Sequence, residues 1–419
     1  MLYGIAAATA ALALAAVLAA LLRVPALRVG LVERRQRVRR VPSSGGPAVV
    51  AATCGIAVLG DRTGLAPLDP GTGALLAAAG AVALLGLAAD LWRLKTRFLV
   101  IGTTVSASFV IPYGDIGVLG GVVSVAWVVF VALAFRSLDH ADGVAGTAGV
   151  VTAFGAGACA AAEVLDGPAA LLSVLAAALT GFLMHNWPHA RVGLGTCGAL
   201  FTGFLPAAVA VQACAGREPL AGAGVLLALT AVAALDVVLV ALSRARAGRP
   251  LLRTAPDHLA HRLRRLGITA QGSVVLIGAG VFAGVLVGVL VHMGWTGGAA
   301  SVWVAAGAVV AVLGLLRVRV YGAPGRPAPA VKVRAGRSGE RVGNRAPGPR
   351  RLGRASGSRR LTLVSRLVVR RLGGVRRLGL GSVGRKGAQV VGVTPGARVQ
   401  GPRRGESSQV RGDMRVRNG

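Results

Sequence analysis

Eleven stretches of predominantly apolar residues recur along the chain, and they limit its fold more than any other feature. They cover residues 2–22, 47–60, 73–89, 98–113, 116–135, 144–163, 168–184, 198–214, 220–242, 273–293 and 299–316. A helix needs about 20 apolar residues to cross a bilayer, and somewhat fewer when its ends lie in protein. Because backbone polar groups find no water inside a bilayer, such stretches form helices. We therefore predict an all-α integral membrane protein with about eleven transmembrane helices.

The composition excludes a set of soluble domains. The chain is 54% hydrophobic and 15% charged, and its mean hydropathy is +0.67, whereas soluble domains have about 25% charged residues. Aromatic residues make up only 4%, so small and aliphatic residues dominate, as in packed transmembrane helices. The four cysteines have no metal-ligand spacing, and we predict that they are packing residues.

The net charge of +32 is unevenly distributed. Residues 318–419 contain 25 Lys and Arg against 3 Asp and Glu, a net of +22, and residues 1–317 contain 22 against 12, a net of +10. We therefore predict a membrane domain over 1–317 and an Arg-rich, disordered cytoplasmic tail over 318–419. The tail is either a solvated extension or a ligand for anionic lipid headgroups. Since it has no interleaved aromatic residues, we expect no nucleic-acid partner.

Alternating loop charge predicts the orientation of the chain. Arg and Lys cluster in 23–40, 93–97 and 243–272, whereas the loops near Asp115, Asp166 and Glu218 have almost no positive excess. Positive loops remain cytoplasmic, so the N-terminus is predicted outside and the C-terminus inside the cell. Arg residues follow the first apolar stretch rather than precede it, which predicts a retained helix instead of a cleaved signal peptide.

The candidate functional residues all fall on the predicted cytoplasmic side. Each one alone is adequately explained as an interfacial residue, but together they form a set of acids, imidazoles and Arg suited to a phosphate-bearing substrate. Asp236, within an apolar stretch, adds a carboxylate at a depth where ionisable groups are usually functional. The other members are Asp90, Asp139, Asp142, Asn186, His189, Arg191, Asp257, His258, His261 and Arg262.

The order of these segments resembles the polyprenyl-phosphate N-acetylhexosamine-1-phosphate transferases over residues 1–317. This is glycosyltransferase family 4, in the superfamily of UDP-GlcNAc and MurNAc-pentapeptide phosphotransferases. Asp236 resembles an intramembrane Asp of the family, and its surroundings are closer to the branch that uses simple UDP-hexosamines. The other matching segments are PSSGGPA at 42–48, GLAAD at 86–90, LDHADGVAG at 138–146, NWPHARVGLGTCG at 186–198 and DHLAHRL at 257–263.

The resemblance implies an activity and a set of roles. It implies transfer of a hexosamine-1-phosphate from a UDP-sugar to polyprenyl phosphate at the cytoplasmic face of the plasma membrane. UMP is released, Mg²⁺ is the cofactor, and the product serves cell-envelope glycan synthesis. Asp90 and Asp139 are then catalytic, and Asp139 is also a magnesium ligand. The resemblance also implies that the substrates are bound by Asp142, Asn186, Asp257, His258, His261 and Arg262.

Four positions depart from the family pattern. Ala89 and Thr196 stand where the family has carboxylates, Arg136 stands in place of an Asn, and His140 in place of a Gly. Because Mg²⁺ binds through carboxylates and phosphates, the two lost acids leave an alternative open. This is an inactive homologue that binds nucleotide-sugar or lipid phosphate, or a partner subunit. A transporter is disfavoured, since no inverted repeat is evident.

Overall fold

The computed structural model describes residues 2–33, 41–250, 257–318 and 320. The tail beyond 320 lies outside these residues, so its predicted disorder and lipid binding remain predictions. The described residues form helices, together with one pair of two-residue strands. The helices are α1 (Leu2–Leu21), α2 (Arg23–Val29), α3 (Gly45–Arg62), α4 (Pro70–Trp92), α5 (Thr96–Ser108), α6 (Tyr113–Leu138), α7 (Val144–Ala162), α8 (Asp166–Asn186), α9 (Gly195–Ala213), α10 (Pro219–Arg246), α11 (Leu259–Arg265), α12 (Ala270–His292) and α13 (Ala299–Leu316).

The predicted all-α membrane fold is confirmed. Each predicted apolar stretch coincides with one helix, and among the described residues nine helices are long and apolar enough to cross a membrane. The two that fall short are α5, which has 13 residues, and α3, whose last turn carries Asp61 and Arg62. The predicted number of eleven spans and the orientation therefore remain predictions.

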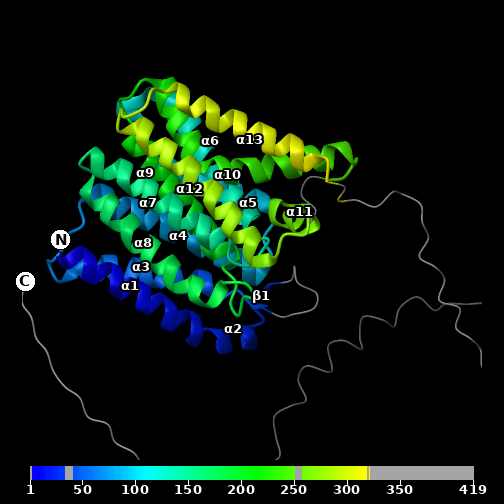
Figure 1. Cartoon of the computed structure of the whole chain (residues 1–419). Helices are drawn as coiled ribbons and strands as arrows, with labels where there is room; N and C mark the ends of the chain where they lie inside the picture. The colour runs from blue at the N-terminus through cyan, green and yellow to red at the C-terminus, as the bar shows by residue number, and fades with distance from the viewer. Residues whose placement is uncertain (1, 34–40, 251–256, 319, 321–419) are drawn as a thin grey trace, which may run out of the picture. The chain divides into compact units, whose positions relative to one another are not determined.

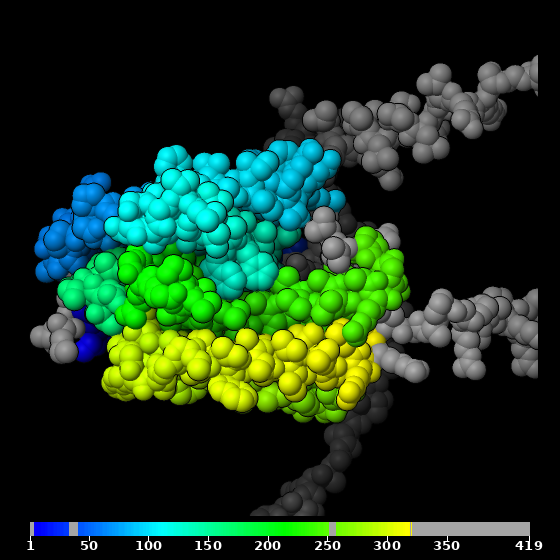
Figure 2. All heavy atoms as spheres, turned by 90° about the horizontal axis from the view of Figure 1, so that it is seen from above, coloured from blue at the N-terminus to red at the C-terminus, as the bar shows by residue number. Residues whose placement is uncertain are grey.

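The long helices lie side by side, with α9 in the interior (Figure 1). Helix α9 contacts α3, α4, α6 and α7, and 89% of its apolar stretch is buried. On one side α1 packs against α3 and α8, and on the other α13 packs against α10 and α12. Figure 2 shows α13 along an outer edge, and only 11% of it is buried. An apolar helix with so little protein contact needs lipid as its neighbour.

Glycines allow α9 to approach its neighbours at backbone distance. A Cβ atom added to Gly46 of α3 would lie 2.4 Å from the backbone nitrogen of Gly198 in α9. One added to Gly86 of α4 would lie 2.7 Å from the Cα atom of Cys197. Small residues at helix contacts are the usual means of close packing in membranes, where van der Waals contact drives association. This packing places the beginning of α9 beside the end of α4.

The polar loops meet at one end of the helix bundle. The strands β1 (Val32–Glu33) and β2 (Val41–Pro42) form an antiparallel pair, and α2, β1 and α11 lie at the same end (Figure 1). The loop before α9 is joined to the segment before α3, because the amide of Gly193 donates to the carbonyl of Pro42 at 2.8 Å. The amide of Gly45 in turn donates to the carbonyl of Gly193 at 3.0 Å. This is the end that loop charge predicts to be cytoplasmic.

Candidate active site

Two carboxylates from different helices converge on the beginning of α9. Asp90, near the end of α4, accepts hydrogen bonds through Oδ2 from the amides of Thr196 at 2.8 Å and Cys197 at 3.3 Å. Asp139, which follows α6, accepts from the amide of Gly195 at 3.0 Å. The first amides of a helix lack partners within the helix and carry partial positive charge, so they stabilise anions. The sequence-predicted catalytic pair is therefore brought together by the structure.

Gly195 makes this convergence sterically possible. Its φ of +70° lies in the left-handed region, which favours glycine. An added Cβ atom would lie 2.8 Å from the Cβ of Ser43 and 3.0 Å from Oδ2 of Asp90. The following residue, Thr196, also donates a side-chain hydrogen bond to Asp90. A hydroxyl thus stands beside Asp90 where the family pattern has a second acid.

Asp142 and Asn186 tie two loops of the site together. Asn186 is buried, its Oδ1 accepts from the amide of Gly143 at 2.8 Å, and its Nδ2 donates to the carbonyl of Val192 at 2.7 Å. Asp142 is only partly buried, and its Oδ2 accepts from the amide of Ala190 at 3.1 Å. The structure therefore places both predicted substrate-binding residues at the α6–α7 and α8–α9 loops. Asn186 has both ends of its amide engaged with backbone.

A second polar cluster surrounds Asp236 of α10, whose side chain is 0% exposed. Its Oδ1 accepts from the amide of Leu259 at 2.8 Å, and its Oδ2 accepts from the hydroxyl of Ser137 at 3.2 Å. Oδ2 also lies 3.0 Å from Nδ1 of His258. Because a buried carboxylate needs such partners, Asp236 anchors the segment that carries His258 against α6 and α10.

Three imidazoles gather beside Asp236. The rings of His140 and His258 stack, with centroids 4.3 Å apart and planes 16° apart. The ring of His261 lies 5.3 Å from that of His140. Burial lowers the pKa of His261, and the nearby His258 lowers it further. Burial also lowers the pKa of His140 to about 3. His140 is thus neutral at physiological pH.

The remaining predicted substrate-binding residues are engaged within the protein. Asp257 is 0% exposed and accepts two hydrogen bonds from Arg244, from Nε at 2.7 Å and from Nη2 at 3.0 Å. Arg262 is 1% exposed and donates to Asp257 and to the end of α13. It donates hydrogen bonds to the carbonyls of Asp257, Leu315 and Val318 and to the hydroxyl of Ser243. Asp257 and Arg262 therefore have a structural role, because their hydrogen bonds join α10, α11 and α13.

The list of site residues predicted from the sequence leaves out two residues that the structure places at the site. His140 enters the imidazole cluster, and Arg136 interacts electrostatically with Asp90. Both were visible only as departures from the family pattern. The signal that could have found them is their nearness in the chain to Asp139, because Arg136 lies in the last turn of α6 and His140 directly follows Asp139. His189 and Arg191 lie in the α8–α9 loop, where the amide of Arg191 donates to the carbonyl of His185 at 2.8 Å.

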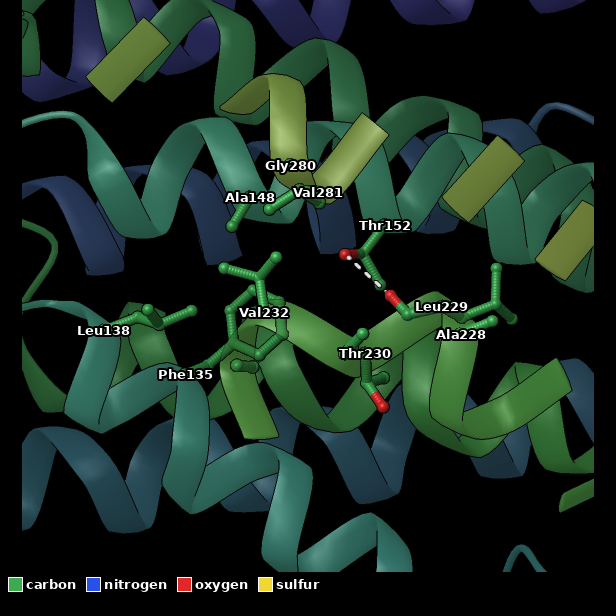
Figure 3. Close-up of a pocket in the computed structure, with 12 residues that line it drawn as sticks. Phe135, Leu138, Ala148, Thr152, Ala228, Leu229, Thr230, Val232, Gly280 and Val281 are labelled. Carbon is green, nitrogen blue, oxygen red and sulfur yellow. Dashed lines mark hydrogen bonds between the residues drawn. The ribbon is translucent and has the colours of Figure 1, made fainter. Parts of the chain in front are cut away.

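A cavity inside the bundle is too small to be the substrate site. It lies among α6, α7, α10 and α12, and measures about 10 Å³, which is about the space of one water molecule. Figure 3 shows its lining, which includes Thr152 and Thr230 among apolar side chains. The hydroxyl of Thr230 already donates to the carbonyl of Leu226 at 2.8 Å. The polar end of the bundle remains the better candidate.

Comparison with known proteins identifies the family. The sequence model of glycosyl transferase family 4 matches residues 72–214. A Streptomyces coelicolor protein, named only provisionally as a glycosyltransferase, is 55% identical over 426 aligned positions that cover 100% of both chains. The chain belongs to this family. Its members transfer sugar phosphates to polyprenyl phosphate, and with its apolar helices the protein is a multi-pass protein of the plasma membrane.

Two mycobacterial relatives carry more specific names. The decaprenyl-phosphate N-acetylglucosaminephosphotransferase of Mycolicibacterium smegmatis is 31% identical over 232 residues, covering 47% of this chain and 57% of that protein. The protein of the same name from Mycobacterium tuberculosis is 29% identical over 229 residues, covering 46% of this chain and 57% of its own. The aligned regions thus span little more than half of these relatives.

The residues at the start of α9 fit a magnesium ion. Asp90 and Asp139 supply two carboxylates at the successive amides of Thr196 and Gly195. Mg²⁺ is usually held by one or two carboxylates, with substrate phosphates and water as the other ligands. The Thr196 hydroxyl is neutral and is turned to Asp90. The donor set therefore suits Mg²⁺ that arrives with a phosphate-bearing substrate.

Proposed function

We propose that the protein transfers a hexosamine-1-phosphate from a UDP-sugar to polyprenyl phosphate at the cytoplasmic membrane face. The observation that carries this proposal is the convergence of Asp90 and Asp139 on the first amides of α9. The names of the mycobacterial relatives specify decaprenyl phosphate and N-acetylglucosamine phosphate, which favours N-acetylglucosamine as the sugar here.

The reaction is a displacement at phosphorus. An oxygen of the lipid phosphate bonds to the β-phosphorus of the UDP-sugar, and the bond from that phosphorus to the bridging oxygen breaks. UMP leaves with the bridging oxygen, and a lipid-linked diphosphate sugar remains. Such reactions depend chiefly on positioning and on stabilisation of the charge on the phosphoryl oxygens. The protein therefore needs carboxylates in fixed positions to hold the metal ion. It also needs basic side chains or hydrogen-bond donors in fixed positions to bind the phosphates.

Asp90 and Asp139 would act on the reacting phosphate. Asp90 would orient the lipid phosphate and accept its proton when that phosphate is singly protonated. Both carboxylates would hold Mg²⁺, which when bound neutralises phosphate charge and polarises the phosphorus–oxygen bonds. Arg136, which interacts with Asp90, would add a guanidinium near the same phosphates. The amides of α9 hold the two carboxylates in place before substrate arrives.

The nucleotide-sugar would lie between the two loops that Asn186 joins. Asp142 is the partly exposed acid there and would accept a hydrogen bond from the uridine. Asn186 would act as a positioning residue, because its amide is bonded to Gly143 and Val192. His258 and His261 would face the diphosphate. Asp257 and Arg262 would support them by holding α11 against α10 and α13.

The test is release of UMP by the purified full chain. The assay supplies radiolabelled UDP-N-acetylglucosamine, polyprenyl phosphate and MgCl₂, with UDP-glucose as a competing donor. We expect UMP release above a heat-killed control, and a loss of about 100-fold or more in Asp90→Asn and Asp139→Asn, the range for a catalytic acid or base. Asp115→Asn is the matched control, since Asp115 lies in the first turn of α6, at the opposite end from Asp139.

Two outcomes would overturn the proposal. Labelled UDP-N-acetylglucosamine that is retained by the protein without any UMP release would indicate a binding protein instead of an enzyme. Equal rates in Asp90→Asn, Asp139→Asn and the unaltered chain would place the reaction elsewhere. Circular dichroism and size-exclusion profiles of each variant separate lost catalysis from lost folding, because both carboxylates also bond to the start of α9.

A further inference from the structure

His140, Asp236 and His258 are three buried metal-ligating groups that lie together. One ligand atom from each lies within 4.8 Å of the other two. The residues are 7%, 0% and 8% exposed, respectively. They come from the α6–α7 turn, from α10 and from the segment before α11. Only the tertiary fold brings them together, since His140 and Asp236 are nearly one hundred positions apart.

His140 carries a buried nitrogen without a partner. Its Nδ1 lies 3.0 Å from the carbonyl oxygen of Ser137, and because a carbonyl only accepts, Nδ1 carries the proton. Nε2 therefore presents a lone pair, and this buried atom has no hydrogen-bond partner in the described structure. Leaving such an atom unsatisfied costs free energy, and native proteins seldom do so without a function. A hydrogen-bond donor or a metal ion would satisfy this lone pair.

We propose that His140, Asp236 and His258 bind a transition-metal ion such as Zn²⁺, at a site separate from the carboxylate pair Asp90 and Asp139. Two imidazoles and one carboxylate form a donor set that Zn²⁺ and Co²⁺ prefer, whereas Mg²⁺ prefers oxygen ligands alone. The negative charge of Asp236 offsets part of the charge of the ion. The site shares His258 with the groups proposed to face the diphosphate, but metal binding there does not require transferase activity.

The groups around the cluster already orient its ligands. The Ser137 carbonyl holds the tautomer of His140 that leaves Nε2 unprotonated. The Leu259 amide holds Oδ1 of Asp236 at 2.8 Å. Hydrogen bonds of this kind, from outside the ligand set, direct metal-binding side chains and raise their affinity. Two of the three ligands, His140 and Asp236, are therefore already oriented by their neighbours.

Metal binding requires one rearrangement. The rings of His140 and His258 are stacked face to face, with planes 16° apart, and two imidazoles stacked in this way cannot direct their lone pairs at one ion. Since Ser137 holds His140, the ring of His258 would turn out of the stack and exchange its 3.0 Å contact with Asp236 for the metal. His261, whose ring lies 5.3 Å from that of His140, is within reach as a fourth ligand.

The experiment measures metal binding directly. Full-length protein with a streptavidin-binding tag and no polyhistidine is purified in detergent, stripped with chelator and titrated with Co²⁺. We expect one equivalent to give absorption bands between about 500 and 650 nm, typical of Co²⁺ in tetrahedral sites that also suit zinc. Zn²⁺ should displace the Co²⁺. Elemental analysis of protein purified without chelator should find about one zinc per chain.

His140→Phe is the informative variant, because it retains an aromatic ring in the stack and removes Nε2. It should weaken Co²⁺ binding by at least about 100-fold, and Asp236→Asn should do the same. His185→Phe is the matched control, since His185 is a half-buried histidine at the end of α8. It should bind Co²⁺ like the unaltered chain. The unfolding temperature should rise with Zn²⁺ in the unaltered chain and in His185→Phe, but not in His140→Phe.

Two results would overturn the site. The first is the absence of Co²⁺ absorption bands from the unaltered chain at 100 µM metal. The second is a His140→Phe variant that binds Co²⁺ as tightly as the unaltered chain. Titrations contain no nucleotide-sugar or lipid phosphate, so failure here leaves the UMP result untouched. Conversely, an inactive protein that binds Co²⁺ through His140 would support the metal site and contradict the proposed transferase activity.

Discussion

At the residue scale, Thr196 at the start of α9 changes the electrostatic environment of Asp90, because the family pattern has an acid at this position. Asp90 accepts hydrogen bonds from the backbone amides of Thr196 and Cys197 at 2.8 and 3.3 Å. It also accepts a hydrogen bond from the side chain of Thr196. The threonine hydroxyl thus partners Asp90 directly. A second acid at position 196 would repel Asp90 unless a cation lay between them.

Thr196→Asp should therefore make stability depend on Mg²⁺. Without the ion we expect a lower unfolding temperature than in the unaltered chain, and with several millimolar MgCl₂ a rise larger than the unaltered chain shows. Thr196→Asn has nearly the same size and no charge, and it should lack this larger rise. The measurement is thermal unfolding in detergent followed by circular dichroism. Equal Mg²⁺ responses in Thr196→Asp and Thr196→Asn would contradict the repulsion argument.

At the scale of single elements, helix contacts and helix ends each depend on particular residues. Helix α3 approaches α9 through Gly46, where an added Cβ would meet backbone atoms of Gly198 and Leu194 at 2.4 Å. Backbone atoms cannot move aside as a flexible side chain can. At the beginning of α4, Asp69 accepts from the amide of Thr72 at 2.9 Å and caps the helix.

Gly46→Ala should separate α3 from α9 and destabilise the protein. Overpacking of this kind typically costs 1–3 kcal/mol, and we expect about 2 kcal/mol or more here. Gly55→Ala is the matched control on the same helix, because nothing lies within 4 Å of its added Cβ. It should leave stability unchanged or raise it, since alanine favours helix. Denaturant unfolding in mixed micelles measures both, and equal effects would refute the close approach of these helices.

Asp69 makes a pH-dependent contribution to α4. Hydrogen bonds from the Thr72 hydroxyl and amide hold the pKa of this carboxyl below its usual range. Its stabilisation is therefore complete above the pKa of the unfolded chain, about 4, and is lost as pH falls through the lower folded pKa. Asp69→Ala should cost about 0.5–1 kcal/mol at pH 7 and less at pH 2–3.

Asp69→Asn supplies the control for this cap. Asparagine also caps helices but does not titrate in this range, so its stability relative to the alanine variant should not change between pH 7 and pH 3. Free energies of unfolding measured at several pH values test whether the contribution of Asp69 depends on pH. A difference between the aspartate and alanine chains that stays constant down to pH 2 would contradict the titration argument.

At the scale of the whole membrane domain, buried charges join helices that are distant in the chain. Arg244 of α10 pairs with Asp257 through bonds of 2.7 and 3.0 Å, and the pair is 5% and 0% exposed. Arg262 then connects Asp257 to α13 through the carbonyl of Leu315 at 2.7 Å. These bonds hold α11, and with it the imidazole cluster, against α10 and α13.

Arg244→Ala should leave the Asp257 carboxylate buried without its main counter-charge. Breaking a buried pair from one side usually costs 3–5 kcal/mol, and we expect an effect of that order on unfolding. Arg246→Ala, on the same helix and exposed, should change stability by less than about 0.5 kcal/mol. Limited proteolysis should cut within α11 faster in Arg244→Ala. Similar unfolding and cleavage in the two variants would contradict this arrangement.

Much of the fold was predictable, because its determinants are local. An apolar stretch of about 20 residues must form a helix in a bilayer whatever its neighbours are, so every predicted stretch coincides with a helix. The weakest predictions were the ranges 47–60 and 98–113, because their helices, α3 and α5, are short or less apolar. The family was also recognisable from the order of polar segments.

The sequence by itself determined the membrane class, the helices and the chain positions of the acids and imidazoles. Only the tertiary structure decided which of these groups face one another. Asp90 meets the amide of a residue 106 positions away, whereas Asp257 and Arg262 turn to protein partners. It also left Nε2 of His140 buried without a partner. The reason is physical: helix formation depends on neighbours along the chain, but hydrogen-bond partners and burial depend on residues that packing brings together.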